Sequence, residues 1–186
     1  TLEASGRSLA DLAGLKSVVG AAAARMTESQ VDWPSVRLWD LLEERPVVGS
    51  RIDPDGVDDE RPFVSTSLVT NSGGRLDQVP TEKTRGKRKA RAARRGDVLL
   101  ASRGIDGSSR RVSCATVDVD AELVYSDSLL LLTPKADRLD PDYLRYALTS
   151  SSGVAALAAL ATGTTIANIR PDALLELEIR VPPLDV

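Results

Sequence analysis

The sequence contains no histidine and only one cysteine, Cys114. Histidine is the commonest general base and the commonest metal ligand, so its absence excludes every catalytic triad that depends on it. A single cysteine excludes an internal disulfide and any cysteine-based zinc cluster. We therefore expect Cys114 to be a small buried residue.

Aromatic residues and long apolar runs are also scarce. Only 3% of the residues are aromatic, which gives poor support to a stacking platform for single-stranded nucleic acid. No apolar stretch approaches the eighteen or so residues of a membrane helix, and no basic and apolar leader opens the chain. We expect a soluble cytoplasmic protein that makes no membrane contact.

The remaining composition is that of one folded domain. Apolar residues make up 42% and charged residues 27% of the 186 residues, which are ordinary globular values. The chain begins at Thr1 rather than at methionine and ends at Val186 without an evident stop signal. We therefore expect it to be a piece of a longer protein.

The periodicity of apolar residues predicts helices at the beginning of the chain. From Ser8 onward, one helical stripe is formed by Leu9, Leu12, Leu15, Val19, Ala22 and Met26. After a break at Pro34, a second short helix is expected over residues 36–42, and residues 48–60, rich in Asp, Gly and Pro, are expected to form a loop.

Strands and helices are predicted to alternate in the remaining sequence. Strands are expected at residues 63–69, 98–102, 112–117, 123–125, 129–132 and 177–181. Asp140 and Pro141 provide an N-cap and a first-turn proline for one helix, and Val154, Leu157 and Leu160 mark another. The sequence predicts an α/β domain, with α+β as the alternative, in which helices flank a small mixed sheet. Residues 1–30 would be a helical N-terminal segment, and residues 31–186 the main domain.

The most distinctive local feature is a run of cations without any acidic residue among them. It consists of Lys83, Arg85, Lys87, Arg88, Lys89, Arg91, Arg94 and Arg95. The net charge of the chain is −3, and without these eight charges it would be −11. Clustered cations on an otherwise acidic protein favour a polyanionic partner, because counterion release rewards contact with phosphates. A solvated loop that prevents aggregation, or a nuclear-targeting patch, would have the same composition.

A second loop contains side chains that are able to distinguish bases. Arg103, Arg110 and Arg111 lie beside glycines and the paired Ser108 and Ser109. Guanidinium groups donate to guanine edges in the major groove, so this loop is a candidate for base recognition on duplex DNA. An ordinary hairpin would also explain it. If the DNA interpretation holds, the basic run should be exposed, should be unpaired by carboxylates of the chain and should adjoin these glycine loops.

Several motifs in order resemble one known family. Residues 96–104 resemble a Gly-Asp-hydrophobic strand with a glycine loop, and residues 128–144 resemble the strand, connection and helix that follow it. Residues 163–170 and 174–184 resemble the family's terminal glycine turn and its strand ending in Pro182 and Pro183. The segment from Trp33 to Leu41 is similar to its entry segment. The family is the target-recognition domain of type I restriction-modification DNA specificity subunits, or the equivalent C-terminal domain of a fused N6-adenine DNA methyltransferase.

The resemblance implies sequence-specific binding of double-stranded DNA by a domain that is not itself an enzyme. It implies a methyltransferase (modification) subunit, and a restriction subunit, as partners, with S-adenosylmethionine held by the methyltransferase and not by this chain. The family's last strand leads into a long helix and whole subunits carry two such domains, whereas this chain stops at Val186 with one. The chain would thus be half of a specificity subunit or the tail of a fused enzyme.

Side-chain chemistry, rather than the resemblance, assigns roles within this domain. The eight cations of the run would contact phosphates, because they carry charge without base specificity. Base recognition would fall to Arg103, Ser108, Ser109, Arg110, Arg111, Thr164, Thr165, Asn168 and Arg170. The alternative function is a protein-interaction module in which the basic run binds an acidic partner and the glycine loops are only turns.

Two catalytic interpretations find little support in the sequence. The segment from Asp140 to Tyr143 approaches the Asp-Pro-Pro-aromatic loop of an adenine methyltransferase, but Asp142 stands where the second proline belongs, and a helix cap explains it fully. A metal-dependent nuclease would need an acidic pair with an Asp/Glu-x-Lys triplet, and the sequence has no such triplet. Asp118 and Asp120 are expected to flank a strand end without partners.

Overall fold

The computed structural model describes residues 33–86, 91–104, 111–163 and 167–182, of which 52–60 and 84–86 are described by their backbone only. Apart from Trp33, these residues belong to one compact unit, Pro34–Val186. The predicted helix over residues 8–26 lies outside the described residues, and the division into residues 1–30 and 31–186 stays a prediction. In the described ranges no helix is long and apolar enough to cross a membrane.

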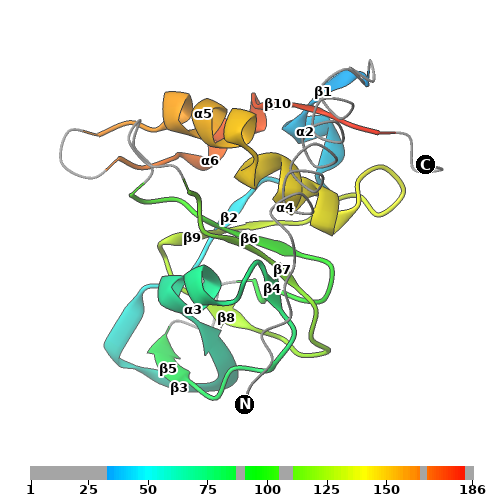
Figure 1. The fold of residues 1–186 in the computed structure, drawn as a ribbon. Helices are drawn as coiled ribbons and strands as arrows, with labels where there is room; N and C mark the ends of the chain where they lie inside the picture. The colour runs from blue at the N-terminus through cyan, green and yellow to red at the C-terminus, as the bar shows by residue number, and fades with distance from the viewer. Residues whose placement is uncertain (1–32, 87–90, 105–110, 164–166, 183–186) are drawn as a thin grey trace, which may run out of the picture. The chain divides into compact units, whose positions relative to one another are not determined.

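A mixed five-stranded sheet lies at the centre of this unit (Figure 1). Its strands, in spatial order, are β2 (Val47–Val48), β9 (Leu129–Leu132), β6 (Val98–Ala101), β7 (Cys114–Val117) and β4 (Arg75–Leu76). Neighbouring strands are antiparallel except β4 and β7, which are parallel. The α/β class with a small mixed sheet is therefore confirmed.

The central strands of this sheet are buried on both faces. Along β6, Val98 and Leu100 belong to one hydrophobic core, while Leu99 and Ala101 belong to another. The four leucines of β9 alternate in the same way, which explains why both strands read as continuous apolar runs in the sequence. Side chains alternate between the faces of a strand, so a sheet with a core on each side needs apolar residues at every position.

Three helices cover one face of the sheet: α4 (Pro141–Thr149), α5 (Ser151–Leu160) and α6 (Pro171–Leu175) (Figure 1). Their buried leucines pack in the same core as Val98 and Leu100. The predicted start of α4 is confirmed, because the carboxylate of Asp140 accepts a hydrogen bond of 2.9 Å from the Tyr143 amide and Pro141 is the first helical residue.

The other face carries α3 (Thr66–Asn71) and a three-stranded sheet of β5 (Lys83–Gly86), β3 (Ile52–Val64) and β8 (Val124–Tyr125). The sequence predicted a loop where β3 lies. Shifts in strand register between Ile52 and Val57 and between Asp59 and Pro62 accommodate the prolines and glycine that suggested a loop.

The predicted strand over residues 63–69 is wrong beyond Val64. The chain turns into α3 instead, because the Ser65 hydroxyl accepts a hydrogen bond of 3.3 Å from the Leu68 amide and caps the new helix. The β-branched residues of this segment had indicated a strand, but the cap and the burial of Val69 decide its structure.

The beginning and end of the described chain pair with each other. Strand β1 (Ser35–Arg37) is antiparallel to β10 (Glu178–Arg180), and the short helix α2 (Leu38–Leu41) follows β1 directly. The predicted helix over residues 36–42 is thus shorter than expected, since Val36 lies in a strand. The single cysteine is buried, as predicted, and burial raises the pKa of Cys114 to about 12.

Candidate nucleic-acid interface

Three turns meet at one end of the five-stranded sheet. Strands β6 and β9 are antiparallel with Ala101 opposite Leu129, so the turn after β6 and the turn before β9 lie at the same end. The Ser102 amide donates to the Ser128 carbonyl at 2.9 Å, and the Ser102 hydroxyl donates to the same carbonyl at 3.1 Å. These two turns are therefore fastened to each other by their backbones.

The third turn comes from the segment that precedes α6. The Ile169 amide donates to the Ser102 carbonyl at 2.8 Å, the Gly104 amide donates to the Ala167 carbonyl at 2.9 Å, and Arg103 and Asn168 form an isolated antiparallel bridge. We call residues 102–104, 126–128 and 167–169 together the sheet-end junction. Its first and last segments are more than sixty residues apart in the sequence.

Arg103 and Asp127 form an ion pair on the surface of the junction. Arg103 Nη2 lies 3.3 Å from Asp127 Oδ2, and the two side chains are 49% and 31% exposed. The hydroxyls of Ser126 and Ser128 make long hydrogen bonds of 3.5 and 3.4 Å to the other carboxylate oxygen, Oδ1. The carboxylate is thus held in place, while the guanidinium keeps most of its N–H donors for other partners.

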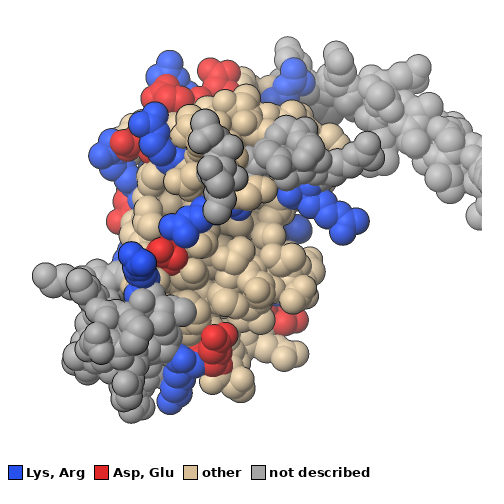
Figure 2. All heavy atoms as spheres, turned by 90° about the vertical axis from the view of Figure 1, so that its left-hand side faces the viewer, with Lys and Arg blue, Asp and Glu red and all other residues tan. Residues whose placement is uncertain are grey.

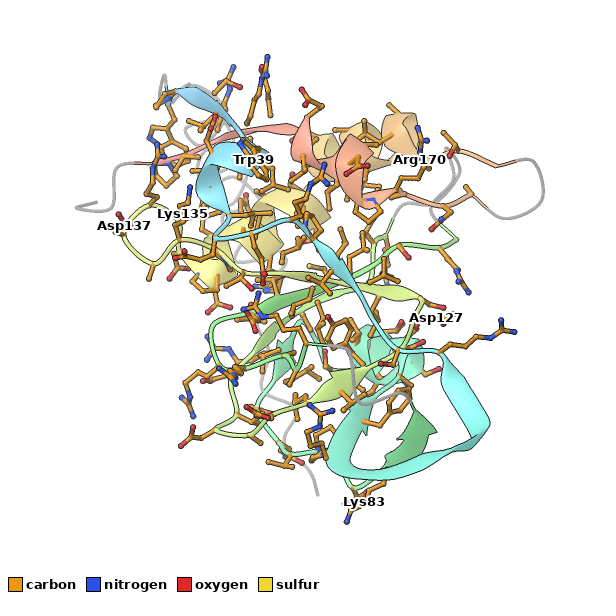
Figure 3. All side chains as sticks on the ribbon, turned by 180° about the vertical axis from the view of Figure 1, so that it is seen from behind. Trp39, Lys83, Asp127, Lys135, Asp137 and Arg170 are labelled. Carbon is orange, nitrogen blue, oxygen red and sulfur yellow. The ribbon has the colours of Figure 1, made fainter. Side chains whose placement is uncertain are left out.

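Arg170 lies on the same side of the molecule as Asp127 (Figure 3). It is exposed and occupies the N-cap position of α6. Lys135 and Asp137 lie on the opposite side of the molecule in the same view. Of the residues predicted to recognise bases, the structure therefore brings Arg103, Asn168 and Arg170 to one end of the sheet.

The other predicted base-recognising residues are described only in part. Arg111 is exposed and comes two residues before Ser113, whose carbonyl accepts from the Ala101 amide at 2.8 Å, so it approaches the same end of β6. Ser108, Ser109, Arg110, Thr164 and Thr165 lie outside the described residues.

The basic run is divided among different parts of the structure. Lys83 is exposed in β5, and the register of β3 and β5 places Asp58 opposite Arg85. Lys87, Arg88 and Lys89 lie outside the described residues. The remaining three cations form ion pairs: Arg91 with Glu44, Arg94 with Glu122 at 2.5 Å and Arg95 with Asp118 at 2.9 Å.

These ion pairs correct the expectation of an unpaired strip beside the glycine loops. Arg94 and Arg95 precede β6, whereas Arg103 follows it, so the four residues of the strand alone separate them by roughly 13 Å. The adjacency predicted from sequence is wrong for Arg94 and Arg95, because sequence proximity ignores the direction of the strand between them. Figure 2 accordingly shows Lys and Arg interspersed with Asp and Glu among its coloured residues.

Asp118 is a second correction, since it has partners. It accepts from Arg75 at 3.1 Å as well as from Arg95. Arg75 also pairs with Asp142, which receives a hydrogen bond of 2.9 Å from the Thr116 hydroxyl. Burial acts to raise the pKa of Asp142, but the hydrogen bonds from Thr116 and Arg75 outweigh it and hold that pKa below its ordinary value.

The Gly-Asp motif before β6 has a clear structural role. Gly96 has φ of 89°, which favours glycine, and Asp97 is only 3% exposed. The Asp97 carboxylate accepts from the Arg94 amide at 2.8 Å and from the Thr133 hydroxyl at 2.6 Å. Oδ2 therefore closes the turn that precedes β6, and Oδ1 connects the start of β6 to the end of β9.

Sequence reasoning missed Asp127 entirely. The available signal was a carboxylate between two serines immediately before a run of four leucines, which is a turn that leads into a buried strand. Nothing in that signal reveals that the turn faces Arg103, twenty-four residues earlier in the sequence.

No family model and no curated protein matches this sequence. Solved structures do match it. They include the HsdS subunit from Thermoanaerobacter tengcongensis, which is 20% identical over 84% of this chain with a TM-score of 0.54. Another belongs to a study of complex assembly and conformational transition of the type I R-M system. It is 20% identical over 83% of this chain, with a TM-score of 0.55. The type I restriction-modification S subunit from M. genitalium is 22% identical over 81% with a TM-score of 0.46.

This chain spans about a third of the length of those structures, 34% of the T. tengcongensis subunit and 35% of the second protein. The resemblance inferred from the motifs is confirmed at the level of the fold. The described domain has the fold of one segment of a type I restriction-modification specificity subunit.

Proposed function

We propose that this domain recognises a specific sequence in double-stranded DNA and directs a type I-like restriction-modification or DNA methyltransferase complex to it. The observation that carries the proposal is the sheet-end junction, where two loops chosen from the sequence for base recognition meet through the Arg103 and Asn168 bridge. Specific recognition needs several donors and acceptors held at fixed mutual positions. The similarity of fold to the HsdS subunit supports the same function.

Base contacts in this proposal come from Arg103, Asn168, Arg170 and Arg111, joined by Ser108, Ser109, Arg110, Thr164 and Thr165. The domain itself has no catalytic role. S-adenosylmethionine would bind to a methyltransferase subunit or a fused methyltransferase, and a restriction subunit would be a further partner. The complex would act in the cytoplasm.

Phosphate contacts come from the basic run even though three of its arginines have carboxylate partners. The ion pairs of Arg91, Arg94 and Arg95 lie at the surface, with arginine side chains 36–69% exposed. An exposed ion pair stabilises a protein by only about 0–1 kcal/mol, so a phosphate is able to replace the carboxylate. In the alternative function, the carboxylates of an acidic protein partner would replace those of Glu44, Glu122 and Asp118 in the same way.

We expect the chain to retard the migration of random-sequence duplex DNA in a gel-shift assay at low salt. A protein-interaction module would not retard it. If four to six cations meet phosphates, the logarithm of the affinity should fall by roughly 3.6 to 5.4 per decade of salt concentration.

Reversing the charge of Arg88 and Arg91 together should weaken binding to all duplexes alike and reduce this slope by up to about 1.8.

The matched control reverses Arg138 and Arg180, two exposed arginines outside the run, with the same change in net charge. This control should leave the slope near that of the unaltered protein. Equal loss of slope in both double variants would contradict the assignment of phosphate contacts to the run, and absence of any shift at low salt would contradict the proposed function.

A further inference from the structure

We propose that Arg103 and Asp127 act as a unit that reads one guanine, with Arg103 donating to the base and Asp127 positioning the guanidinium. This inference rests on the proposed function and names a specificity-determining pair within it. Its basis is the ion pair between Arg103 Nη2 and Asp127 Oδ2 at 3.3 Å on the sheet-end junction.

The pair is not needed to hold the turns of the junction together. The backbones of the three turns are already connected by the hydrogen bonds of Ser102, Gly104 and Ile169. Two more hydrogen bonds anchor the turn that carries Asp127. The Asp127 amide donates to the Ser50 carbonyl at 3.0 Å, and the Ser126 amide donates to the Val64 carbonyl at 3.0 Å. Both side chains are partly exposed, so their ion pair lies at the surface of turns that backbone hydrogen bonds already connect.

The donors of Arg103 suit a guanine edge. A guanidinium has five N–H donors in one plane. The contact with Asp127 uses one N–H of Nη2. The remaining donors can form the two parallel hydrogen bonds to O6 and N7 of guanine, which is the commonest specific contact of arginine with DNA. Fixing the guanidinium beforehand reduces the rotamer entropy lost on binding.

The carboxylate also favours a base over a phosphate. An unpaired arginine is attracted to any phosphate, whereas the negative charge of Asp127 repels phosphate oxygens and offsets the charge of Arg103. A neutral base edge with two acceptors does not suffer this repulsion. The hydroxyls of Ser126 and Ser128 hold the second carboxylate oxygen, which keeps Asp127 oriented toward Arg103.

The experiment selects bound molecules from a library of random duplexes with the full chain and compares the enriched motifs of variants by sequencing. The unaltered protein should enrich a motif that contains a guanine position with a preference of about 5- to 100-fold over other bases. Arg103→Ala should abolish the preference at that one position and leave the other positions of the motif unchanged. Asp127→Asn should keep guanine as the preferred base but weaken the preference, because the guanidinium loses its charged partner.

The matched control is Glu176→Gln, which removes the carboxylate partner of Arg37, an ion pair of 3.6 Å with side chains 62% and 68% exposed. It should leave the whole motif unchanged. Thermal unfolding followed by circular dichroism verifies that each variant is folded at the temperature of selection.

Different results overturn different claims. An unaltered motif in both Arg103→Ala and Asp127→Asn would overturn the guanine assignment while leaving DNA recognition intact. Loss of preference at every position alike in Arg103→Ala would assign Arg103 to phosphate and would also overturn it. Failure of the unaltered protein to enrich any motif would overturn the proposed function and the guanine assignment with it.

Discussion

We expect Leu100→Ala to lower the free energy of unfolding by about 2–5 kcal/mol, the range measured for leucines truncated in well-packed cores. Leu100 is fully buried in the central strand β6 and packs in the core formed with helices α4, α5 and α6. Truncation removes three side-chain carbons and leaves a cavity that the two neighbouring strands cannot close. Urea denaturation followed by circular dichroism measures the loss.

Leu131→Ala provides the companion measurement on the opposite face of the sheet, because Leu131 is 1% exposed and belongs to the second core. A similar loss is expected there if both faces are packed. Val48→Ala, in edge strand β2 with the valine 46% exposed, should change the stability by less than about 0.5 kcal/mol. A loss from Leu131→Ala as small as that from Val48→Ala would contradict a core on both faces.

The second large effect is expected from Asp97→Ala. The buried Asp97 carboxylate satisfies the Arg94 amide and the Thr133 hydroxyl, and both donors would lose their acceptor in the variant. Hydrogen bonds to a charged group contribute about 1.5–3 kcal/mol each, and the relief of carboxylate desolvation offsets part of this, so we expect a loss of about 2–4 kcal/mol. Chemical denaturation at neutral pH measures it.

Asp97→Asn keeps one carbonyl oxygen and should lose less stability than Asp97→Ala. Alanine at the exposed Asp120 should change the stability by less than about 0.5 kcal/mol. Below its unfolding temperature the Asp97→Ala protein should bind duplex DNA as tightly as the unaltered chain, since Asp97 lies at the other end of β6 from the sheet-end junction. Loss of DNA binding by a folded Asp97→Ala protein would give the Gly-Asp motif a role beyond structure.

The elements predicted best from the sequence are those that a continuous apolar run or a helix cap marks. The apolar runs at β6 and β9 and the capped start of α4 were predicted close to their observed bounds, because each depends on local chemistry. Helix α3 was not predicted, and of strand β3 only the end at Phe63 and Val64 was predicted. In both, tertiary pairing or a single serine cap overrides the preferences of the residues.

Some members of the candidate site were predictable from the sequence, but Asp127 and the arrangement of the site were not. Arg103, Asn168 and Arg170 were identified from side-chain chemistry, but their approach depends on strand register across sixty-five residues. The partners of the basic run could not be predicted for the same reason, because Glu44, Glu122 and Asp118 are remote in sequence from the arginines that they bind. A charge run therefore predicts a sign of charge but not whether it is already paired.

The most direct test of the proposed interface asks which side of the domain a duplex covers. Cys114 is buried with a raised pKa, so a cysteine introduced at an exposed site would react selectively with an alkylating reagent. Thr162→Cys lies next to the sheet-end junction, where the Thr162 amide donates to the Asn168 carbonyl at 3.0 Å. Asp137→Cys lies on the opposite side (Figure 3).

At a free duplex concentration about ten times Kd, alkylation at position 162 should slow roughly tenfold, because only about a tenth of the molecules are then unbound. Alkylation at position 137 should keep its rate. Protection at position 137 with unchanged labelling at position 162, under conditions in which the duplex is bound, would contradict the placement of DNA at the sheet-end junction.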